Sequence, residues 1–371
     1  MTLPLLQPHE GPIPGRHYLA STSETVTWGW LPAEGTAPVA EMGSGETITV
    51  DTVSHEGILE DQGRDPVTFF GQFGVDPADV LRDAVDIAAG HPVRDAVGDG
   101  PHVTTGPIAV SGARPGDVLR VDFLEFVPRA PYGVISSRHG YGALAGELPP
   151  LPHLGFVPDP GDPEKAGSVS TFCRASADLT GTLPVPGGRE LRFPLAPFLG
   201  LIGVTPSGAT PLHSVPPGPF GGNMDVKDLV TGTSLYLPVQ VDGAGLFVGD
   251  PHYAQGHGEV ALTALEAPLR ATLRVEVLPS ADSRALLGLL RRPFGETSQH
   301  WIALGLHRDL NEAFREAVRE ALRVLADLYE VPTDIGYAYL SAAADFVVSQ
   351  VVDDVKGVHC LIRKSDFGAW T

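Results

Sequence analysis

The sequence predicts a mainly β protein with a jelly-roll-like β-sandwich core and a smaller α+β part at its C-terminal end. Its 371 residues include 44 glycines and 35 prolines, about a fifth of the chain, where average usage is nearer 12%. Short runs of alternating apolar and polar residues recur along most of the chain, and strong helical periodicity is confined to the C-terminal end. Many short strands with Gly/Pro turns need a second sheet to cover one face.

The N-terminal half shows strand patterns with one helical interruption. Residues 16–55 alternate Thr and Val with polar residues, and residues 102–128 predict a strand, a turn and a second strand. The turn between them, Arg-Pro-Gly-Asp at 114–117, is chemically explicit because Pro sets φ and Gly accepts positive φ. Residues 65–98 are predicted to hold one short helix with Pro77 in its first turn.

The C-terminal half predicts further strands and then helices. Residues 234–248 and 258–278 favour strands, whereas the six prolines of 145–168 indicate a long surface loop or lid. At about 150 residues per domain, the chain is expected to divide into a β-rich domain at 1–190 and an α+β domain at 191–371.

A strong helical pattern begins at Asp309, where Asp309 and Glu312 fit a capping box. Five apolar residues recur at helical spacing after Asp309 and predict the buried face of this helix: Leu310, Phe314, Val318, Leu322 and Leu325. A second helix is expected near Thr333. The segments FVVSQVVDD and GVHCLI then predict a final strand pair.

Charge and cysteine content narrow the classes of function. The chain carries 45 acidic against 25 basic residues, a formal charge of −20, which repels phosphate backbones and anionic lipid and argues against nucleic-acid and membrane partners. The two cysteines, Cys173 and Cys360, are too few for a disulfide scaffold. We therefore expect reduced thiols in a soluble cytoplasmic protein.

Two segments hold residues suited to chemistry. In PFGGNMDVKDL, residues 219–229, two glycines permit close backbone approach, Asn223 can donate to an oxyanion, and Asp225 can ligate a metal or act as a base. Lys227 can orient a carboxylate or bind substrate, although a solvated turn cation is the commoner role. A tight turn closed by a side-chain cap is the structural alternative for the whole segment.

The second segment is GDPHYAQGHGEV, residues 249–260, expected as a loop between two apolar strands. Asp250 and His252, and likewise His257 and Glu259, are two residues apart, so each pair faces one side wherever the chain is extended. Imidazole and carboxylate together suit zinc or a similar divalent ion, and Glu259 can shuttle a proton to a leaving amine. A polar surface loop is the alternative.

Other residues are weaker candidates. His102 begins a predicted strand, where it serves as a metal ligand or as polar decoration of an edge. His55, with Glu56 and Asp51, is a further possible contributor. Glu266 lies on a predicted strand, and because burying an unpaired carboxylate is costly, we expect it to face outward or to support the site from behind.

Three separated blocks carry a resemblance to a known family. HVTTGPIAVSGARPGDVLRVDFLEF, the pair GGNMDVKDL and SLYLPVQVDGAGLFVGDPHYAQGHGEVALTALEAPLRATL, and YLSAAADFVVSQVVDDVKGVH occur in that order between about residues 100 and 365. They closely resemble the acetamidase/formamidase family. The residues that match the family motif are Asn223, Asp225, Lys227, His252, Gln255 and Glu259.

The resemblance implies hydrolysis of the C–N bond of a small linear amide to ammonia and a carboxylate. It also implies a β-sandwich-like core, a homo-oligomer of two or more chains and, in some relatives, a metal ion or a cyclic-amide substrate. This chain departs at His257, where relatives have an acidic residue, and at His102, where they often have Asn. Residues 51–100 also differ from the common form.

The resulting hypothesis is a water-based amide hydrolysis. A divalent metal ion such as zinc is expected to bind His252 and Asp225, with Asp250 or His102 as a further ligand. Glu259 is expected to move the proton, and Asn223 to polarise the amide carbonyl. Three alternatives stay open: a γ-lactam hydrolase, a metal-free amidase in which Lys227 tunes an Asp225–Glu259 carboxylate pair, and a non-catalytic β-sandwich that binds a small ligand.

Overall fold

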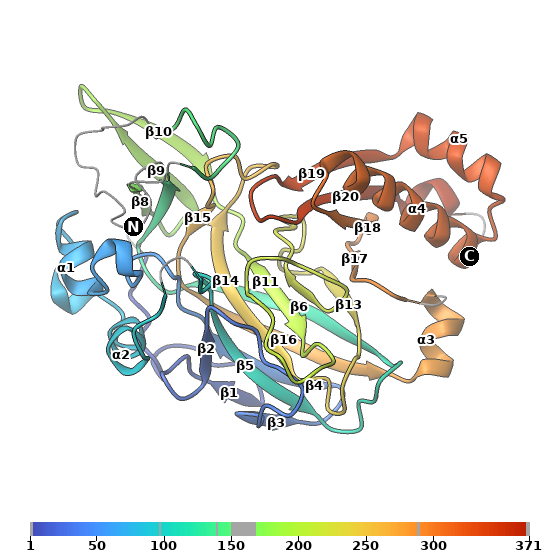
Figure 1. The fold of residues 1–371 in the computed structure, drawn as a ribbon, viewed down its shortest axis with the longest axis horizontal. Helices are drawn as coiled ribbons and strands as arrows, with labels where there is room; N and C mark the ends of the chain where they lie inside the picture. The colour runs from blue at the N-terminus through green and yellow to red at the C-terminus, as the bar shows by residue number, and fades with distance from the viewer. Residues whose placement is uncertain (1–2, 96–97, 139, 150–167, 288–289, 369–371) are drawn as a thin grey trace.

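The protein is built around two large β-sheets, as a computed structural model shows for residues 3–95, 98–138, 140–149, 168–287 and 290–368. One sheet has nine strands in the order β1-β4-β16-β6-β13-β17-β18-β20-β19. The other has eleven, in the order β10-β9-β8-β7-β15-β14-β11-β12, with β5 paired to β14, β2 and β3. Most of the described chain is strand and loop, and helices gather at the two ends (Figure 1).

The strands of the nine-stranded sheet are β1 (His17–Leu19), β4 (Glu46–Asp51), β6 (Val118–Pro128), β13 (Ser234–Pro238), β16 (Leu269–Leu278), β17 (Phe294–Glu296), β18 (His300–His307), β19 (Asp345–Gln350) and β20 (Lys356–Arg363). Those of the eleven-stranded sheet are β2 (Val26–Trp28), β3 (Ala40–Met42), β5 (Val103–Val110), β7 (Tyr132–Arg138), β8 (Ser168–Ala175), β9 (Thr180–Val185), β10 (Arg189–Pro194), β11 (Phe198–Val204), β12 (Gly221–Asn223), β14 (Leu246–Ala254) and β15 (Leu265–Glu266). The helices are η1 (Glu60–Gln62), α1 (Pro66–Gly71), η2 (Pro77–Asp79), α2 (Arg82–Gly90), α3 (Ser280–Leu287), α4 (Leu310–Tyr329), α5 (Thr333–Ala343) and η3 (Lys364–Phe367).

The main hydrophobic core is shared by the two sheets. Ile48 of β4 and Leu273 of β16 belong to the same buried cluster as Ile202 of β11 and Val248 of β14. Side chains of two sheet faces that interdigitate in this way form a sandwich. The predicted fold class, mainly β with an α+β C-terminal part, is therefore confirmed.

Several predicted elements are confirmed. Residues 102–128 form β5 and β6 with the turn at 114–117 between them, where the Asp117 N–H donates to the Arg114 carbonyl at 3.0 Å. The second C-terminal helix begins at Thr333 as expected, and the final strand pair is β19 and β20, which are antiparallel.

The helix expected within 65–98 is divided. The structure has α1, the single 3₁₀ turn η2 and then α2, so Pro77 begins η2 and lies outside α2. The Asp76 carboxylate accepts from the Ala78 N–H and caps η2, and the chain at Val80 and Leu81 is extended. Pro77 is therefore in the first turn of η2, and the longer helix α2 begins only at Arg82.

Helix α4 begins where predicted, but its buried face differs from the predicted one. The Asp309 carboxylate accepts from the Glu312 N–H at 3.0 Å, whereas the Asp309 N–H donates to His307, so the capping box is half formed. Leu310 and Phe314 are exposed. An alanine face packs on β18 and β20, so close that a Cβ on Gly305 would clash with the α4 backbone.

Strands from both halves of the chain share both sheets. β4 and β6 flank β16 in one sheet, and β7 and β11 lie on either side of β14 and β15 in the other. The division at residues 190 and 191 stays a prediction. Residues 150–167, most of the predicted loop or lid, lie outside the described residues. Among the described residues, none of the helices has the length and apolar character needed to cross a membrane.

Candidate active site

The centre of the eleven-stranded sheet carries the candidate site. Strand β14 pairs with β11, β15 and β5 and brings Asp250 and His252 onto one side, where His252 Nε2 lies 3.0 Å from Asp250 Oδ2. These two residues belong to the strand itself, which corrects the expected loop, and they confirm the expected shared face of the Asp-x-His pair. Both side chains are buried.

A glycine on β11 makes room for these groups. A Cβ added to Gly200 would lie 2.6 Å from Asp225 Oδ1, 2.6 Å from His252 Cε1 and 2.8 Å from Asp250 Oδ2. These separations are shorter than real Cβ contacts. The site therefore requires glycine at position 200 if the carboxylates and the imidazole are to keep their places.

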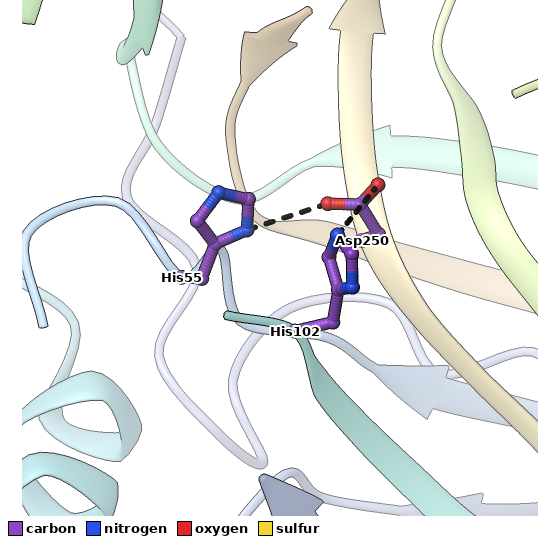
Figure 2. A group of neighbouring side chains, drawn as sticks. All are labelled: His55, His102 and Asp250. Carbon is purple, nitrogen blue, oxygen red and sulfur yellow. Dashed lines mark ion pairs between the residues drawn. The ribbon is translucent and has the colours of Figure 1, made fainter. Parts of the chain in front are cut away.

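Two further histidines flank Asp250. His55, in the loop after β4, places Nδ1 3.4 Å from Asp250 Oδ1, and His102, just before β5, places Nε2 3.9 Å from Asp250 Oδ2. Figure 2 shows the carboxylate between the two imidazole rings, with one oxygen turned to each. The Ser214 hydroxyl lies 3.1 Å from His102 Nδ1 and so fixes the ring from behind.

Buried carboxylates surround His252. Glu266 Oε1 lies 3.0 Å from His252 Nε2, and Asp225 Oδ1 lies 3.9 Å from His252 Nδ1. Ligand atoms of Asp225, His252 and Glu259 lie within 4.8 Å of one another. The Gln255 amide oxygen lies 3.0 Å from His252 Nδ1, which orients the ring.

Three of these acids have left-handed backbones. The φ angles are 53° at Asp225, 47° at Asp250 and 47° at Glu259. Non-glycine residues seldom adopt positive φ, and such strain tends to gather at functional sites. At Glu259 the turn also breaks the extended spacing, so His257 and Glu259 face different groups, contrary to the expectation for that pair.

Burial and repulsion between neighbouring carboxylates raise the pKa values of three acids in the cluster. Burial, with the Glu259 carboxylate, raises the pKa of Asp225 well above its usual range. Burial, with Asp353, likewise raises the pKa of Glu259, although His252 opposes the shift. Burial, with Asp250, raises the pKa of Glu266 to about 7.

The pKa values of the three imidazoles are shifted in different directions. Burial alone would lower the pKa of His252, but Glu266 and Asp250 outweigh it and raise that pKa well above its ordinary value. The same balance, with Asp250 and Glu56, raises the pKa of His55 to about 10. Burial lowers the pKa of His102 to about 4, which leaves this imidazole neutral.

The donor set fits a cation. Within the described chain, several buried oxygens have no hydrogen-bond partner, and an unpaired buried charge is costly. Those in the cluster include both carboxylate oxygens of Asp225, Oδ1 of Asp250 and Oε2 of Glu266. His55, His102 and Asp250 form one possible ligand set, Asp225, His252 and Glu259 a second, and Asp250, His252 and Glu266 a third. Mixed imidazole and carboxylate sets of this kind suit zinc and similar ions.

A supporting network holds His55. Glu56 Oε1 lies 3.5 Å from His55 Nε2 and 3.5 Å from Arg138 Nη1, while the Ser136 hydroxyl donates to Glu56 Oε2 at 2.5 Å. Burial would raise the pKa of Glu56, but the Arg138 guanidinium and His55 hold it at about 2. Outer residues of this type orient the groups that do the chemistry.

A groove opens beside the cluster. Its volume is about 920 Å³, and Glu259, Gln255, Lys227 and His257 line it together with apolar side chains that include Phe193 and Val260. Glu259 therefore belongs both to the buried cluster and to the groove wall. Lys227 lies on the groove and interacts electrostatically with Asp228 and His257.

The structure brings most of the predicted site residues together. His252, Asp250, His102, Asp225 and Glu259 form one connected group. Asn223 adjoins it through Asp353, whose carboxylate accepts from Asn223 Nδ2 at 2.9 Å. Lys227 stands on the groove wall.

Sequence reasoning missed Asp353 and named Glu56 only as a companion of His55. Burial raises the pKa of Asp353 to about 7. Its only signal in the sequence is the acidic pair of the VVDD segment, and that of Glu56 is its position next to His55. Glu266 is 2% exposed and contacts His252, so it takes the supporting position, which was one of its two expected places.

Comparison with known proteins gives a consistent result. Residues 208–358 match the model of the Acetamidase/Formamidase family. Formamidase from Methylophilus methylotrophus is 29% identical over 196 residues, covering 43% of this chain and 47% of that protein. Acetamidase from Mycolicibacterium smegmatis is 28% identical over 199 residues, covering 43% and 49%. The chain thus spans about half the length of the curated relatives it matches.

The structural likeness is more extensive. The crystal structure of an acetamidase from Bacillus halodurans superposes with a TM-score of 0.70 at 26% identity, covering 95% of this chain and 99% of that one. The sequence match at 208–358 includes Asp225, Asp250, His252 and Glu259, whereas His55 and His102 lie outside it. These two histidines reach the site through the fold.

Proposed function

We propose that this chain, whose residues 208–358 match the model of the acetamidase/formamidase family, hydrolyses the C–N bond of a small amide. The products are a carboxylate and ammonia. One observation carries the proposal: a buried imidazole and carboxylate cluster meets an open groove at Glu259. A small linear amide of short chain length is the substrate class that the resemblance favours.

Amide hydrolysis needs an electrophilic clamp and a proton carrier, because amide resonance protects the carbonyl and an amine leaves poorly. Glu259 is the group of the cluster that lines the groove, and burial raises its pKa, which is how a carboxyl group is tuned for acid–base catalysis. It accepts a proton from the attacking water and returns it to the departing nitrogen. Water adds to the carbonyl carbon, the C–N bond breaks, and ammonia leaves.

The other residues of the site position the substrate and polarise its carbonyl group. Asn223 donates one amide N–H to Asp353 and retains a second N–H for the developing oxyanion. Gln255 holds the His252 ring and also donates to the Asp225 carbonyl at 3.1 Å. Lys227 orients the substrate or a carboxylate from the groove wall.

A divalent metal ion such as zinc fits His252 and Asp225 with Asp250 or His102. When bound, such an ion acts as a Lewis acid and lowers the pKa of water. The orphaned oxygens of Asp225 and Asp250 support this assignment. In the metal-free alternative, Asp225 and Glu259 share protons as a coupled carboxylate pair, and their mutually raised pKa values favour it.

An ammonia-release screen tests the function. Purified protein is assayed on formamide, acetamide, a γ-lactam and urea, before and after chelation and after metal is returned, with elemental analysis of each sample. Release from a short amide supports the proposal, and loss on chelation with recovery supports the metal. Release from the lactam alone identifies the cyclic-amide alternative.

Matched variants separate catalysis from binding. Asp225→Asn and Glu259→Gln keep the shape of each side chain and remove its charge, so each is expected to abolish ammonia release. If no amide is hydrolysed by the wild type while amides still bind, the chain is a small-ligand-binding β-sandwich and the proposal is wrong. We further propose a cytoplasmic homo-oligomer with neither nucleic-acid nor membrane partners, to be checked by light scattering and fractionation.

A further inference from the structure

A second group of metal-ligating side chains lies outside the cluster described above. Ligand atoms of Asp228, His257 and His359 lie within 4.8 Å of one another, and none of the three belongs to the buried cluster around Asp250. Asp228 and His257 line the groove, and His257 is exposed. His359 is buried at the base of the group.

Backbone contacts fix the geometry of this group. The loop that carries His257 is tied to β19, because the Gly258 N–H donates to the Ser349 carbonyl at 3.0 Å and the Val351 N–H donates to the Gly258 carbonyl at 3.1 Å. His359 lies on β20, which pairs with β19. The three side chains therefore converge from well-separated parts of the sequence.

His359 is already oriented as a ligand. Ser349 Oγ lies 2.7 Å from His359 Nδ1, and Asp228 Oδ2 lies 3.0 Å from His359 Nε2. A hydroxyl on the far nitrogen holds the ring in place, as outer groups do for metal-bound histidines. Serine, histidine and aspartate in this order also resemble a nucleophilic triad, but Ser349 is 1% exposed and substrate in the groove does not reach it.

The separations fit one ion after a small movement. In tetrahedral coordination with Zn–N and Zn–O distances near 2.1 Å, two ligand atoms lie about 3.4 Å apart, whereas the three ligand atoms here lie within 4.8 Å of one another. His257 is exposed, so its ring can rotate to close that gap. Two imidazoles and one carboxylate satisfy three positions, and the remaining positions face the groove.

We propose that Asp228, His257 and His359 form a second cation site at the groove wall, which binds a divalent transition metal ion such as Zn²⁺. Water, or an oxygen atom of a molecule in the groove, takes the open positions. The proposal does not depend on amide hydrolysis, and it gives His257 a role at the position where this chain departs from the residue usual in the resemblance.

Equilibrium dialysis of the full chain against Zn²⁺, with elemental analysis, tests the site. The wild type is expected to retain one more equivalent of Zn²⁺ than His257→Ala and than Asp228→Asn. His300→Ala is the matched control, because His300 also lines the groove but is not part of the group, and it is expected to bind as the wild type does.

Two measurements make the result decisive. Thermal unfolding without metal establishes that the variants fold, which the exposure of His257 favours. Visible absorption of added Co²⁺ is expected to lose one component in His257→Ala and in Asp228→Asn while the His300→Ala spectrum is unchanged. Equal Zn²⁺ content in the wild type and both site variants would overturn the proposal.

Discussion

Replacing Gly200 by alanine tests whether the spacing of the buried cluster matters for catalysis. The new Cβ would lie 2.6 Å from Asp225 Oδ1 and from His252 Cε1, whereas ordinary van der Waals contact begins near 3.4 Å. The groups must therefore separate by about 0.8 Å. Gly200 lies on β11, which is hydrogen-bonded on both sides to β12 and β14, so the side chains move rather than the strand.

The expected loss follows from that displacement. A misplacement of about 1 Å in an active site costs on the order of 100-fold in rate, which corresponds to about 2.7 kcal/mol of transition-state stabilisation. Overpacking also costs about 1–3 kcal/mol of stability. We expect kcat/KM for ammonia release to fall about 100-fold, with a folded protein of lower Tm.

The assay compares Gly200→Ala with Gly71→Ala. Gly71 ends helix α1, and a Cβ there meets nothing within 4 Å, so this control should keep wild-type activity and stability. Circular dichroism and thermal unfolding establish that both variants fold. Wild-type kcat/KM in folded Gly200→Ala would refute the assignment of chemistry to the groups around this glycine.

Three further predictions concern charge and capping. In chelator-treated protein, Asp225→Asn should raise Tm, because a buried acid whose pKa is raised on folding destabilises the folded state when it is ionised. The same variant should lower kcat/KM by about 100-fold or more. A lower Tm with full activity would contradict this prediction. The pKa of Glu56 falls from 4.5 to about 2 on folding, so its stabilisation is complete above about pH 5 and is lost as pH falls toward 2. The Tm difference between wild type and Glu56→Gln should accordingly shrink from pH 6 to pH 3, and a constant difference would disprove the linkage. Asp309→Ala removes the cap of α4 and should cost about 1 kcal/mol in urea unfolding, whereas an unchanged midpoint would show that the cap is dispensable.

Local sequence patterns were sufficient to predict a turn and a helix start that are each specified by a few neighbouring residues. The Arg-Pro-Gly-Asp motif predicted the turn between strands β5 and β6, and Asp309 predicted the start of α4, because both depend on interactions within a few residues. The buried face of α4 was predicted only in part. Leu325 is buried, and Val318 and Leu322 are partly buried against the core, but Leu310 and Phe314 are exposed. Gly305 of β18 permits a close approach that favours small alanines over large apolar residues.

The candidate site divides in the same way. Asp250 and His252 are neighbours on one strand, so strand periodicity alone placed them on one face. Asp353 carries no local signal of comparable strength, because it reaches the site through a contact with Asn223, 130 residues away in the sequence. Glu56 could be linked to the site only through its neighbour His55.

The sequence by itself determined the β-rich class, the acidic surface charge and the two segments that hold Asp225 and His252. Only the tertiary structure decided that His55 and His102 flank Asp250 and that His257 turns away from Glu259 toward His359. The physical reason is that the alternation of side chains along a strand relates residues only two positions apart. Which loops lie next to each other depends instead on how the two sheets pack and on which backbone positions adopt positive φ.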